Sequence, residues 1–490
     1  MRAAYTTAEV RAAEAPLLES LPEGSLMARA ASALASSCAA LLGAVYGARV
    51  VVLAGSGGNG GDALYAGARL AARGARVDAL LLSDSVLAPA LAALRASGGY
   101  AAAAPGADCA ELLRRADLVI DGMLGIGATG ALRPPMAELA GQLDAVDATV
   151  VAVDVPSGVD ASTGEVPGAA VRADATVTFG ALKLGLVVSP GAEHAGLVEL
   201  VDIGLDLPEP SATVLDADDV AALLPAPAAE SDKYRRGVVG IVAGSNAYTG
   251  AAVLAVGGAL GTGVGMVRYA GVKRPGELVR RRWPEAIVTR ISAGDGDGVR
   301  SAGRVQAWVV GSGLGTDDAA GNIIASVLES DLPVLVDADA ITWLGTHQHA
   351  LRGRSAATVL TPHAGEFARL MGLDAAEVEA SRVTHATRAA RELGATVLLK
   401  GSTTVVATPT GALRVNTAST PYLATAGSGD VLSGVCGALL AGGLAAFDAA
   451  SVGAFLHGFA GLLAAGSPAA SITAMDIAEH LPDAVRAIRD

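Results

Sequence analysis

Three kinds of residue are scarce in this chain, and each scarcity argues against a class of protein. Only three of the 490 residues are cysteine, Cys38, Cys109 and Cys436, and they lie far apart. An odd, sparse set without metal-ligand spacing predicts free thiols in a reducing compartment rather than a disulfide framework or a zinc site. Aromatic residues make up 3% and charged residues 17% of the chain, whereas 52% is hydrophobic, so intrinsic disorder is not expected.

Basic residues are also outnumbered by acidic ones, with 35 Lys and Arg against 49 Asp and Glu. The formal net charge of -14 disfavours nucleic acid and anionic membrane as partners, because both attract basic surfaces. The first residues, MRAAYTTAEV, lack the basic and then apolar regions of a signal peptide, so a cytoplasmic protein is predicted. An uncharged stretch from Val431 to Phe447 and an apolar one from Ala449 to Gly466 approach the length of a membrane span. The soluble pattern around them favours buried helices, and no membrane partner is predicted.

The abundant residues, including 62 glycines, indicate an α/β protein of two domains. Short β-rich runs alternate with Ala/Leu-rich helical stretches, the pattern of parallel sheets flanked by helices. A segment rich in Pro and acid, from Leu207 to Ala229, is interpreted as the junction, so the predicted domains are residues 1–210 and 211–490. The predicted strands are Arg49–Ala54, Arg76–Leu82, Asp117–Asp121, Thr149–Asp154 and Ala173–Phe179 in the first domain, and Val238–Ala243, Val305–Gly311, Pro333–Asp337, Thr358–Thr361 and Thr396–Leu399 in the second.

A glycine loop follows the first of these strands in the text RVVVLAGSGGNGGD. Gly55, Gly57 and Gly60 match the dinucleotide fingerprint G-x-G-x-x-G, which alone is a weak signal. A Rossmann dehydrogenase also needs an acid at the end of the second strand, whereas Asp78 stands near the start of that strand. Asp62 would moreover oppose a pyrophosphate at the start of the helix, so a plain NAD-dehydrogenase is disfavoured.

Oxygen-bearing side chains instead gather at the ends of three predicted strands. Asn59 lies in the glycine loop, Asp121 begins DGMLGIG, and Asp154 and Ser157 belong to DVPSGVD. Such oxygens suit a hard cation and could converge in one crevice at the carboxyl edge of the sheet. Each residue taken alone is better explained as a turn or helix cap, but three of them at corresponding strand ends favour a binding site.

Together, GSGGNGGD, DGMLGIG and DVPSGVD resemble the three signature loops of the NAD(P)H-hydrate epimerase family, over roughly residues 1–210. The resemblance implies that Asn59, Asp121 and Ser157 bind K⁺. It assigns contacts with the damaged nucleotide to Gly58, Asn59, Gly60, Gly61 and Asp62, to Gly125, Ile126, Gly127, Ala128, Thr129, Gly130 and Ala131, and to Asp154. The family usually has two adjacent asparagines in the first loop, and Gly58 replaces the first of them. Epimerisation opens and closes the C6–OH bond on both faces of the ring, and Asp154 is predicted to shuttle the proton; its alternative role is to cap the turn before Pro156.

The strongest signal in the second domain is TAGSGD, Thr425–Asp430, which leads into a helix. A Gly/Ser turn before a helix aims backbone N–H groups at one point and suits a phosphoryl group, and an Asp there can take a proton from an attacking hydroxyl. LLKGSTTVV adds Lys400 and a hydroxyl cluster, which can neutralise and bind phosphate. TPHAGEF places His363 after another strand, in a loop where binding and catalytic residues are common.

The segment TAGSGD, which ends in GSGD, is similar to the corresponding segment of ribokinase-like kinases. With YTGAA, GSGLG, TPHAGEF and KGSTT, the set resembles the NAD(P)H-hydrate dehydratase domain, over about residues 211–490. The expected folds are therefore a Rossmann-like three-layer αβα domain and a ribokinase-like αβα domain. The resemblance implies hydrate contacts at Ala251, Gly313 and His363, nucleotide contacts at Lys400, Gly401, Ser402, Thr403, Thr404 and Gly429, and a catalytic role on the substrate hydroxyl for Asp430.

The two resemblances imply repair of NADHX and NADPHX, the hydrates of NADH and NADPH, by a homo-oligomeric enzyme that uses K⁺ in the first domain and Mg²⁺ with ADP in the second. ADP is favoured over ATP because the fused domain order resembles bacterial members. Two alternatives stay open: a ribokinase-like small-molecule kinase fused to a nucleotide-binding domain, and a nucleotide sensor or scaffold without activity.

Overall fold

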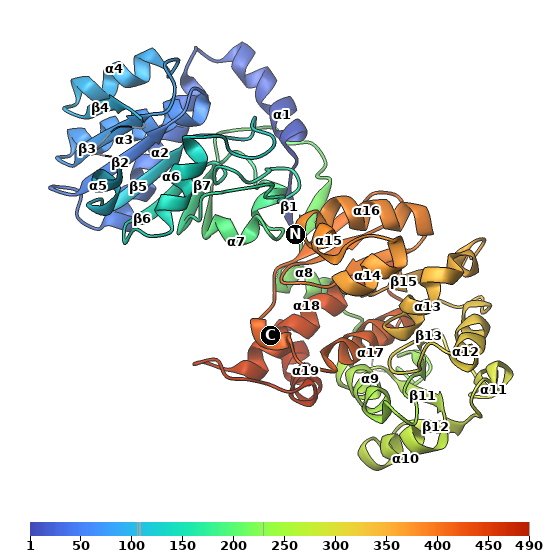
Figure 1. Ribbon diagram of the computed structural model, residues 1–490. Coiled ribbons are helices and arrows are strands. Elements are labelled where there is room, and N and C mark those ends of the chain that lie inside the picture. Colours follow the sequence, from blue (N-terminus) through green and yellow to red (C-terminus); the bar gives the residue numbers. More distant parts are fainter. Residues whose placement is uncertain (105, 107–108, 229, 490) are drawn as a thin grey trace. The chain divides into compact units, whose positions relative to one another are not determined.

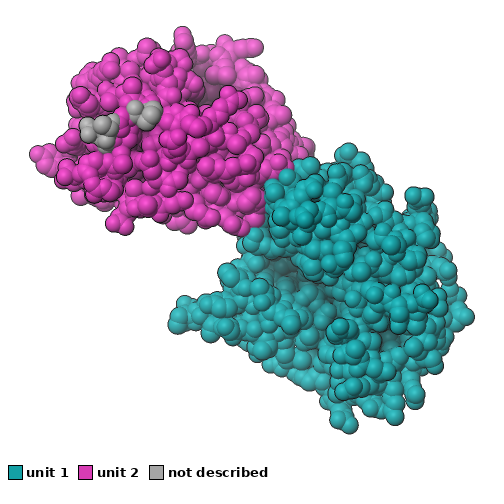
Figure 2. Space-filling model, viewed as in Figure 1, with its two compact units in different colours: residues 1–2, 213–490 teal, residues 3–212 magenta. Residues whose placement is uncertain are grey.

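The computed structural model describes residues 1–104, 106, 109–228 and 230–489. Ala229, the last residue of the predicted junction, and Asp490 lie outside the described residues. The chain forms two compact units, one of residues 3–212 and one of residues 213–490 with residues 1–2 (Figure 2). The division falls between Ala212 and Thr213, beside the position expected from the sequence. We refer to them as the N-terminal and C-terminal units.

The N-terminal unit is built on a seven-stranded sheet with the order β4-β3-β2-β5-β6-β7-β8 (Figure 1). Each neighbouring pair of strands in this sheet runs parallel. The strands are β2 (Arg49–Ala54), β3 (Arg76–Leu81), β4 (Tyr100–Ala103), β5 (Leu118–Gly122), β6 (Thr149–Val153), β7 (Ala175–Phe179) and β8 (Leu197–Val201). Because all strands point the same way, the loops after β2, β5 and β6 meet at one edge of the sheet.

Helices cover both faces of this sheet. Val50 and Val52 of β2 belong to one core cluster, with residues of α2 and α3, whereas Val51 and Leu53 belong to another, with residues of α5 and α6. This alternation is what a strand buried on both faces requires, and it gives three layers. The helices are α1 (Thr7–Ser20), α2 (Ser25–Leu42), α3 (Gly58–Ala72), α4 (Ala88–Ala96), α5 (Cys109–Arg114), α6 (Met136–Leu143), α7 (Ala192–Ala195) and the 3₁₀ turn η1 (Leu184–Leu186).

The second sheet has eleven strands in the order β1-β9-β18-β17-β16-β15-β14-β13-β10-β11-β12, and its strands from β10 to β18 lie wholly in the C-terminal unit. The strands from β12 to β16 are paired in parallel, and β17 pairs antiparallel with both β16 and β18. The strands are β1 (Arg2–Ala4), β9 (Ala212–Val214), β10 (Val238–Val242), β11 (Met266–Gly271), β12 (Ile287–Arg290), β13 (Ala307–Val310), β14 (Val334–Val336), β15 (Thr358–Leu360), β16 (Thr396–Leu399), β17 (Thr404–Ala407) and β18 (Leu413–Asn416).

Helix α17 lies at the centre of this unit. It contacts β10, β13 and β14 as well as α9 and α18, and nearly all of its residues from Val431 to Ala441 are buried. The helices are α8 (Ala217–Leu223), α9 (Thr249–Thr262), α10 (Lys273–Arg282), α11 (Gly296–Arg300), α12 (Asp318–Leu328), α13 (Asp339–His347), α14 (Ala364–Met371), α15 (Ala375–Ala380), α16 (Arg382–Leu393), α17 (Ser428–Ala441), α18 (Ala446–Ala465), α19 (Ala474–Arg489) and the 3₁₀ turns η2 (Gln348–Leu351) and η3 (Pro421–Leu423).

The predicted α/β architecture is confirmed in both units, although several strand ends shift. The strand expected over 149–154 stops at Val153, because Asp154 has a φ of 68° and cannot continue it. Likewise the strand expected over 305–311 ends at Val310, before Gly311 with a φ of 132°. Strands β1, β4, β8, β9, β11, β12 and β18 were not predicted.

Two helices of the described chain, α2 and α18, are long and apolar enough to cross a membrane. Helix α18 is mostly buried within the C-terminal unit, and α2 supplies Leu34 and Cys38 to the N-terminal core. The stretch from Val431 to Gly466 divides into α17 and α18, which pack against each other. The prediction of buried helices in this stretch is confirmed.

Two candidate active sites

The first site begins with the glycine loop between β2 and α3. A Cβ atom at Gly55 would lie 1.9 Å from the carbonyl oxygen of Met123, and one at Gly60 would lie 2.1 Å from the carbonyl oxygen of Gly55. Side chains are therefore excluded at both positions. The absence of these side chains lets the loop fold tightly against the segment that follows β5.

Asn59, Asp121 and Ser157 are brought together beside this loop. The backbone N–H of Ser157 donates to Oδ2 of Asp121 over 2.8 Å, and the Ser157 hydroxyl donates to Oδ1 over 2.7 Å. The Ser157 Oγ in turn accepts the Leu124 N–H, while the Asn59 amide donates to the Leu124 and Val153 carbonyl oxygens. Three loops from three strand ends are thus joined through one small cluster of oxygen atoms.

This cluster fits a hard cation. Asp121 is fully buried and forms no ion pair within the described parts of the chain. Burial raises the pKa of Asp121 to about 6, against the hydrogen bonds from Ser157 and Met123. A carboxylate, a hydroxyl and two carbonyl oxygens form the all-oxygen donor set that a hard cation prefers, and a cation there would stabilise the charged carboxylate.

Asp154 follows β6 and is held by a buried lysine that the sequence interpretation missed. Lys183 is 1% exposed, and its Nζ donates to Oδ1 of Asp154 over 2.5 Å. The same Oδ1 accepts the Thr178 hydroxyl and the Phe179 N–H at 3.0 and 3.2 Å. Oδ2 of Asp154 accepts no hydrogen bond from the residues that the structure describes. The signal for Lys183 in the sequence is a single charge inside the apolar run from Phe179 to Val188.

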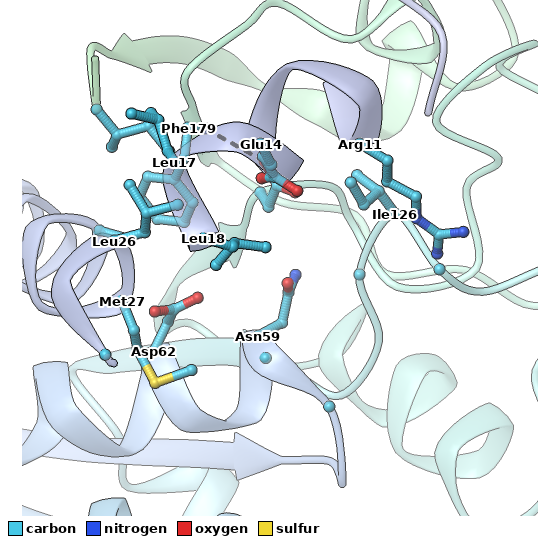
Figure 3. A pocket seen from close by; sticks show the side chains of 18 of the residues that line it. Arg11, Glu14, Leu17, Leu18, Leu26, Met27, Asn59, Asp62, Ile126 and Phe179 are labelled. Atoms are coloured by element: carbon cyan, nitrogen blue, oxygen red, sulfur yellow. Dashed lines mark hydrogen bonds between the residues drawn. The ribbon is translucent and has the colours of Figure 1, made fainter. Parts of the chain in front are cut away.

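A cavity of about 830 Å³ opens beside Asp154. Most of the predicted contact residues line it, as Figure 3 shows for Asn59, Asp62 and Ile126. The predicted residues at the cavity are Gly58, Asn59, Asp62, Gly125, Ile126, Gly127, Ala128 and Asp154. Gly60, Gly61, Thr129, Gly130 and Ala131 are not among its lining residues; a Cβ atom at Gly61 would collide with Leu87 and Met27, which indicates a packing role for that glycine.

Helix α1 forms a wall of this cavity that no motif predicted. Arg11, Glu14, Leu17 and Leu18 line it, and the Glu14 carboxylate points into the space (Figure 3). Burial raises the pKa of Glu14, the charge of Lys183 acts in the opposite direction, and Asp154 adds to the rise. The Thr6–Glu9 capping box is a readable signal for the start of α1, but it does not show which face meets a ligand.

The second site lies at the start of α17. Gly427 has a φ of 88° and precedes the helix. In the first turn the Ser428 and Asp430 N–H groups donate to the carbonyl oxygens of Thr425 and Gly427, whereas the Gly429 N–H has no backbone acceptor among the described residues. The Ser428 hydroxyl lies 3.1 Å from Nε2 of His457. Burial lowers the pKa of His457 to about 4, so this ring is neutral at pH 7 and holds the turn without adding charge.

Lys400 reaches this turn from the end of β16. A Cβ atom at Gly429 would lie 3.2 Å from the Lys400 Nζ, so the missing side chain lets the ammonium group rest against the helix start. The Nζ donates over 3.0 Å to Oδ1 of Asp337, a buried residue that the sequence interpretation missed. Burial alone would raise the pKa of Asp337, but Lys400 and the hydroxyls of Ser433 and Thr361 hold it below its usual value.

Asp430 lies nearby and forms no ion pair with the residues that the structure describes. Burial raises the pKa of Asp430 to about 6, the charge of Asp337 adds to the rise, and a hydrogen bond with Ser312 opposes it. Asp430 and Gly427 line two cavities, one of about 520 Å³ and one of about 930 Å³. Asp430 therefore stands between two spaces that could each hold a ligand.

The other predicted residues divide between the two cavities. Ala251 and Gly313 line the smaller cavity, and a Cβ atom at Gly313 would lie 2.9 Å from that of Ala251. The larger cavity is lined by His363, Lys400, Gly401, Ser402, Thr404 and Gly429, whereas Thr403 is buried beside it. His363 thus lies apart from the two residues with which it was grouped. Its Nδ1 accepts the N–H groups of Gly365 and Glu366 and caps α14.

Comparison with known proteins places the chain in a family. The family model described as YjeF-related protein N-terminus matches residues 23–185, and the one described as NAD(P)H-hydrate dehydratase matches residues 239–483. The bifunctional NAD(P)H-hydrate repair enzyme Nnr of Mycobacterium tuberculosis is 49% identical over 456 residues, which cover 92% of each chain. The chain belongs to the family of bifunctional NAD(P)H-hydrate repair enzymes. A further member of this repair family, from Mycobacterium leprae, is 48% identical over 96% of this chain and 95% of its own.

A solved structure supports the same assignment for the C-terminal unit. The ADP/ATP-dependent NAD(P)H-hydrate dehydratase from Bacillus subtilis, co-crystallised with ATP and Mg²⁺, is 29% identical, with a TM-score of 0.50. The match covers 56% of this chain and 97% of the Bacillus subtilis chain. A ribokinase-like superfamily protein from Enterococcus faecalis has a TM-score of 0.51 at 24% identity, which supports the fold alone. The family and the ribokinase-like fold predicted from the sequence are confirmed.

Proposed function

We propose that this enzyme interconverts the R and S epimers of hydrated NADH and NADPH in its N-terminal unit and dehydrates the S epimer in its C-terminal unit with ADP. The observation that carries the dehydration is the position of Asp430, which lines both the smaller and the larger cavity. A residue shared by two cavities can act on a hydroxyl in one and a phosphoryl group in the other. The donor nucleotide belongs in the larger cavity and the hydrate in the smaller one.

In this mechanism Asp430 accepts the proton of the C6 hydroxyl as that oxygen attacks the terminal phosphorus of ADP, and AMP leaves. Lys400 and the Gly429 N–H stabilise the charge that develops on the phosphoryl oxygens. The ring nitrogen then expels phosphate from C6, and loss of a proton from C5 restores the dihydropyridine. Phosphate leaves much more readily than hydroxide, which explains the need for a phosphoryl donor.

Mg²⁺ would enter with the donor, since it binds proteins chiefly through phosphates, water and one or two carboxylates. Asp337 is already engaged by Lys400, Thr361, Ser312 and Ser433. Glu366, which also lines the larger cavity, accepts the His363 N–H and lies 3.6 Å from the Lys400 Nζ. The ion would therefore be held mainly by the phosphates of the nucleotide and by water, with Glu366 as the nearby carboxylate. When bound, the ion neutralises phosphate charge.

In the N-terminal unit, Asp154 is proposed to exchange a proton with the C6 hydroxyl or with water. Its Oδ1 is fixed by Lys183, and it lines the cavity whose walls carry the predicted contact residues. Asn59, Asp121 and Ser157 would hold K⁺, which fixes the three loops around the nucleotide. K⁺ here has a positioning role.

The deciding experiment mixes the purified enzyme with both hydrate epimers, K⁺, Mg²⁺ and either ADP or ATP. Recovery of reduced cofactor is followed by near-ultraviolet absorbance. Conversion of both epimers supports the two activities, and the faster nucleotide identifies the donor. Conversion of the S epimer alone would remove the epimerase from the proposal, and no conversion with either nucleotide would favour a small-molecule kinase.

We also propose a cytoplasmic homo-oligomer that binds neither nucleic acid nor membrane. The net charge of -14 supports the absence of polyanionic partners. Cys38, Cys109 and Cys436 are buried free thiols, which suits a reducing compartment. Light scattering of the purified enzyme measures the oligomeric state directly.

A further inference from the structure

Asp62 is a buried carboxyl in the N-terminal cavity that the proposed mechanism leaves unused. Its side chain comes from α3, is 7% exposed and lines the cavity, with its carboxyl group directed into the space beneath Glu14 and Leu18 (Figure 3). Its Oδ1 has no hydrogen-bond partner in the described structure. A buried carboxyl oxygen without a partner costs free energy unless a ligand supplies one.

Asp62 and Asp154 line the same cavity but are held in opposite ways. Asp154 receives three donors on Oδ1, and one of them is the ammonium group of Lys183, which forms an ion pair with it. Asp62 receives no cationic partner within the described residues. Burial raises the pKa of Asp62 to about 8, and the charges of Asp154 and Glu14 add to the rise. At pH 7 Asp62 therefore carries a proton that it can donate, whereas Asp154 is paired with a cation.

The other charged residues that line the cavity do not supply Asp62 with a cationic partner. Arg11, Glu14 and Glu23 are the remaining charged lining residues in the part of the chain that the structure describes. Glu14 is the one of these whose charge acts on Asp62, and it favours the protonated form. Lys183 forms its ion pair with Asp154.

Epimerisation at C6 needs chemistry on both faces of the ring, because the hydroxyl departs from one face and water adds to the other. A single carboxyl fixed on one side can serve only one of these steps. We propose that Asp62 is the second proton-transfer residue of this site and serves the face of the ring opposite to the one served by Asp154. This inference rests on the proposed epimerase function.

Inversion at C6 begins when the Asp62 carboxyl gives its proton to the C6 hydroxyl. The C6–O bond breaks, and water leaves while the N1 lone pair forms an N1=C6 double bond. On the other face, a water molecule gives a proton to Oδ2 of Asp154 as its oxygen bonds to C6, and the double-bond electrons return to N1. Asp62 regains a proton from solvent and Asp154 loses one. The reverse reaction exchanges the two roles.

The test follows oxygen exchange and inversion separately. Each pure epimer is incubated with enzyme and K⁺ in ¹⁸O-labelled water, without ADP or ATP so that dehydration does not occur, and the separated epimers are analysed by mass spectrometry. The wild-type enzyme should label and invert both. Asp62→Asn should lose inversion by at least about a hundredfold and still label one epimer, because departure and return on the face of Asp154 remain possible. Asp154→Asn should label only the other epimer.

The matched control is Asp78→Asn, which changes an aspartate of similar burial (8% exposed) that lies on β3 and does not line this cavity. It should keep both exchange and inversion. Inversion by Asp62→Asn at a wild-type rate would overturn the inference, and so would loss of labelling from both epimers. Failure of the wild-type enzyme to invert would instead overturn the proposed epimerase function, so the two failures are distinguishable.

Discussion

Each unit has a lysine and two aspartates at its candidate site, but the lysine pairs with a different kind of aspartate in each. The residues are Lys183, Asp154 and Asp62 in the N-terminal unit and Lys400, Asp337 and Asp430 in the C-terminal unit. In the N-terminal unit Lys183 contacts Asp154, the residue proposed to meet the substrate. In the C-terminal unit Lys400 contacts Asp337, and Asp430 is left with a raised pKa. The lysine is therefore paired with the proposed catalytic carboxyl in the N-terminal unit and with a different carboxyl in the C-terminal unit. A sequence motif that lists the acids does not contain this information.

The largest expected effect is the loss of one activity, with the other retained, after a single substitution in one unit. Asp430→Asn should reduce dehydration of the S epimer by about 10²–10⁴-fold, because the proton acceptor is lost, and should leave epimerisation unchanged. Asp154→Asn should reduce epimerisation and leave dehydration of the S epimer unchanged. Rates are measured with each pure epimer, and donor binding to Asp430→Asn is checked by calorimetry. An Asp430→Asn enzyme that still dehydrates the S epimer at the wild-type rate would contradict the proposed mechanism.

The second effect tests the ion pair that is specific to the C-terminal unit. Asp337→Asn leaves Lys400 without its charged partner and should lower the free energy of unfolding of this unit by about 3 kcal/mol. Trp283, Trp308 and Trp343 are the three tryptophans of the chain, and all lie in this unit, so tryptophan fluorescence in urea reports on it alone.

The control for this substitution is Asp297→Asn, whose side chain is 95% exposed and pairs only weakly with Arg300 at 3.8 Å. It should leave the urea midpoint unchanged. Equal midpoints for Asp337→Asn and the wild-type enzyme would show that the buried pair does not stabilise the unit.

The third effect is a contrast in pH dependence. Asp430 must be ionised to accept a proton, and burial raises its pKa to about 6, so dehydration should fall about tenfold for each pH unit below 6. With Asp62 as donor at a pKa of about 8, epimerisation should instead fall above pH 8, and it should do so in both directions because the equilibrium constant between the epimers ties the two kcat/KM values together. Profiles of kcat/KM from pH 5 to about 9 test both. An acid limb for dehydration near the ordinary aspartate pKa of about 4 would mean that Asp430 is not the proton acceptor.

The smallest effect concerns Gly58, which replaces the usual asparagine of the family. A Cβ atom at Gly58 would meet no atom within 4 Å, and the residue lines the cavity. Gly58→Asn should therefore change stability by less than about 0.5 kcal/mol and lower the KM of epimerisation by up to about tenfold through one added hydrogen bond.

Gly60→Asn is the contrasting variant, because its Cβ would lie 2.1 Å from the Gly55 carbonyl oxygen. It should unfold or inactivate the N-terminal unit, as thermal unfolding and the epimerase assay would show. A Gly58→Asn enzyme that behaves like Gly60→Asn would contradict the open space found at Gly58.

The sequence was informative where chemistry is local. Uniformly apolar strands such as Val50–Leu53, and glycine loops that need close backbone approach, could be placed from their letters alone. Asp154 and Lys183 are 29 residues apart, and Asp337 and Lys400 are 63 apart, so their pairing depends on sheet order. The wall formed by α1 was missed for the same reason, because a capping box predicts a helix and not the surface that it covers.

The cavity wall formed by α1 matters for the design of an isolated N-terminal fragment. The family model of the N-terminal unit matches from residue 23, whereas Arg11, Glu14, Leu17 and Leu18 precede it. The members of the two main core clusters of this unit all lie at or beyond Ala30. A fragment cut at the recognised start would keep these two clusters, but it would lose the smaller cluster that contains Tyr5 and Val10 and one side of the N-terminal cavity. Its purity and solubility would then be misleading guides to its competence.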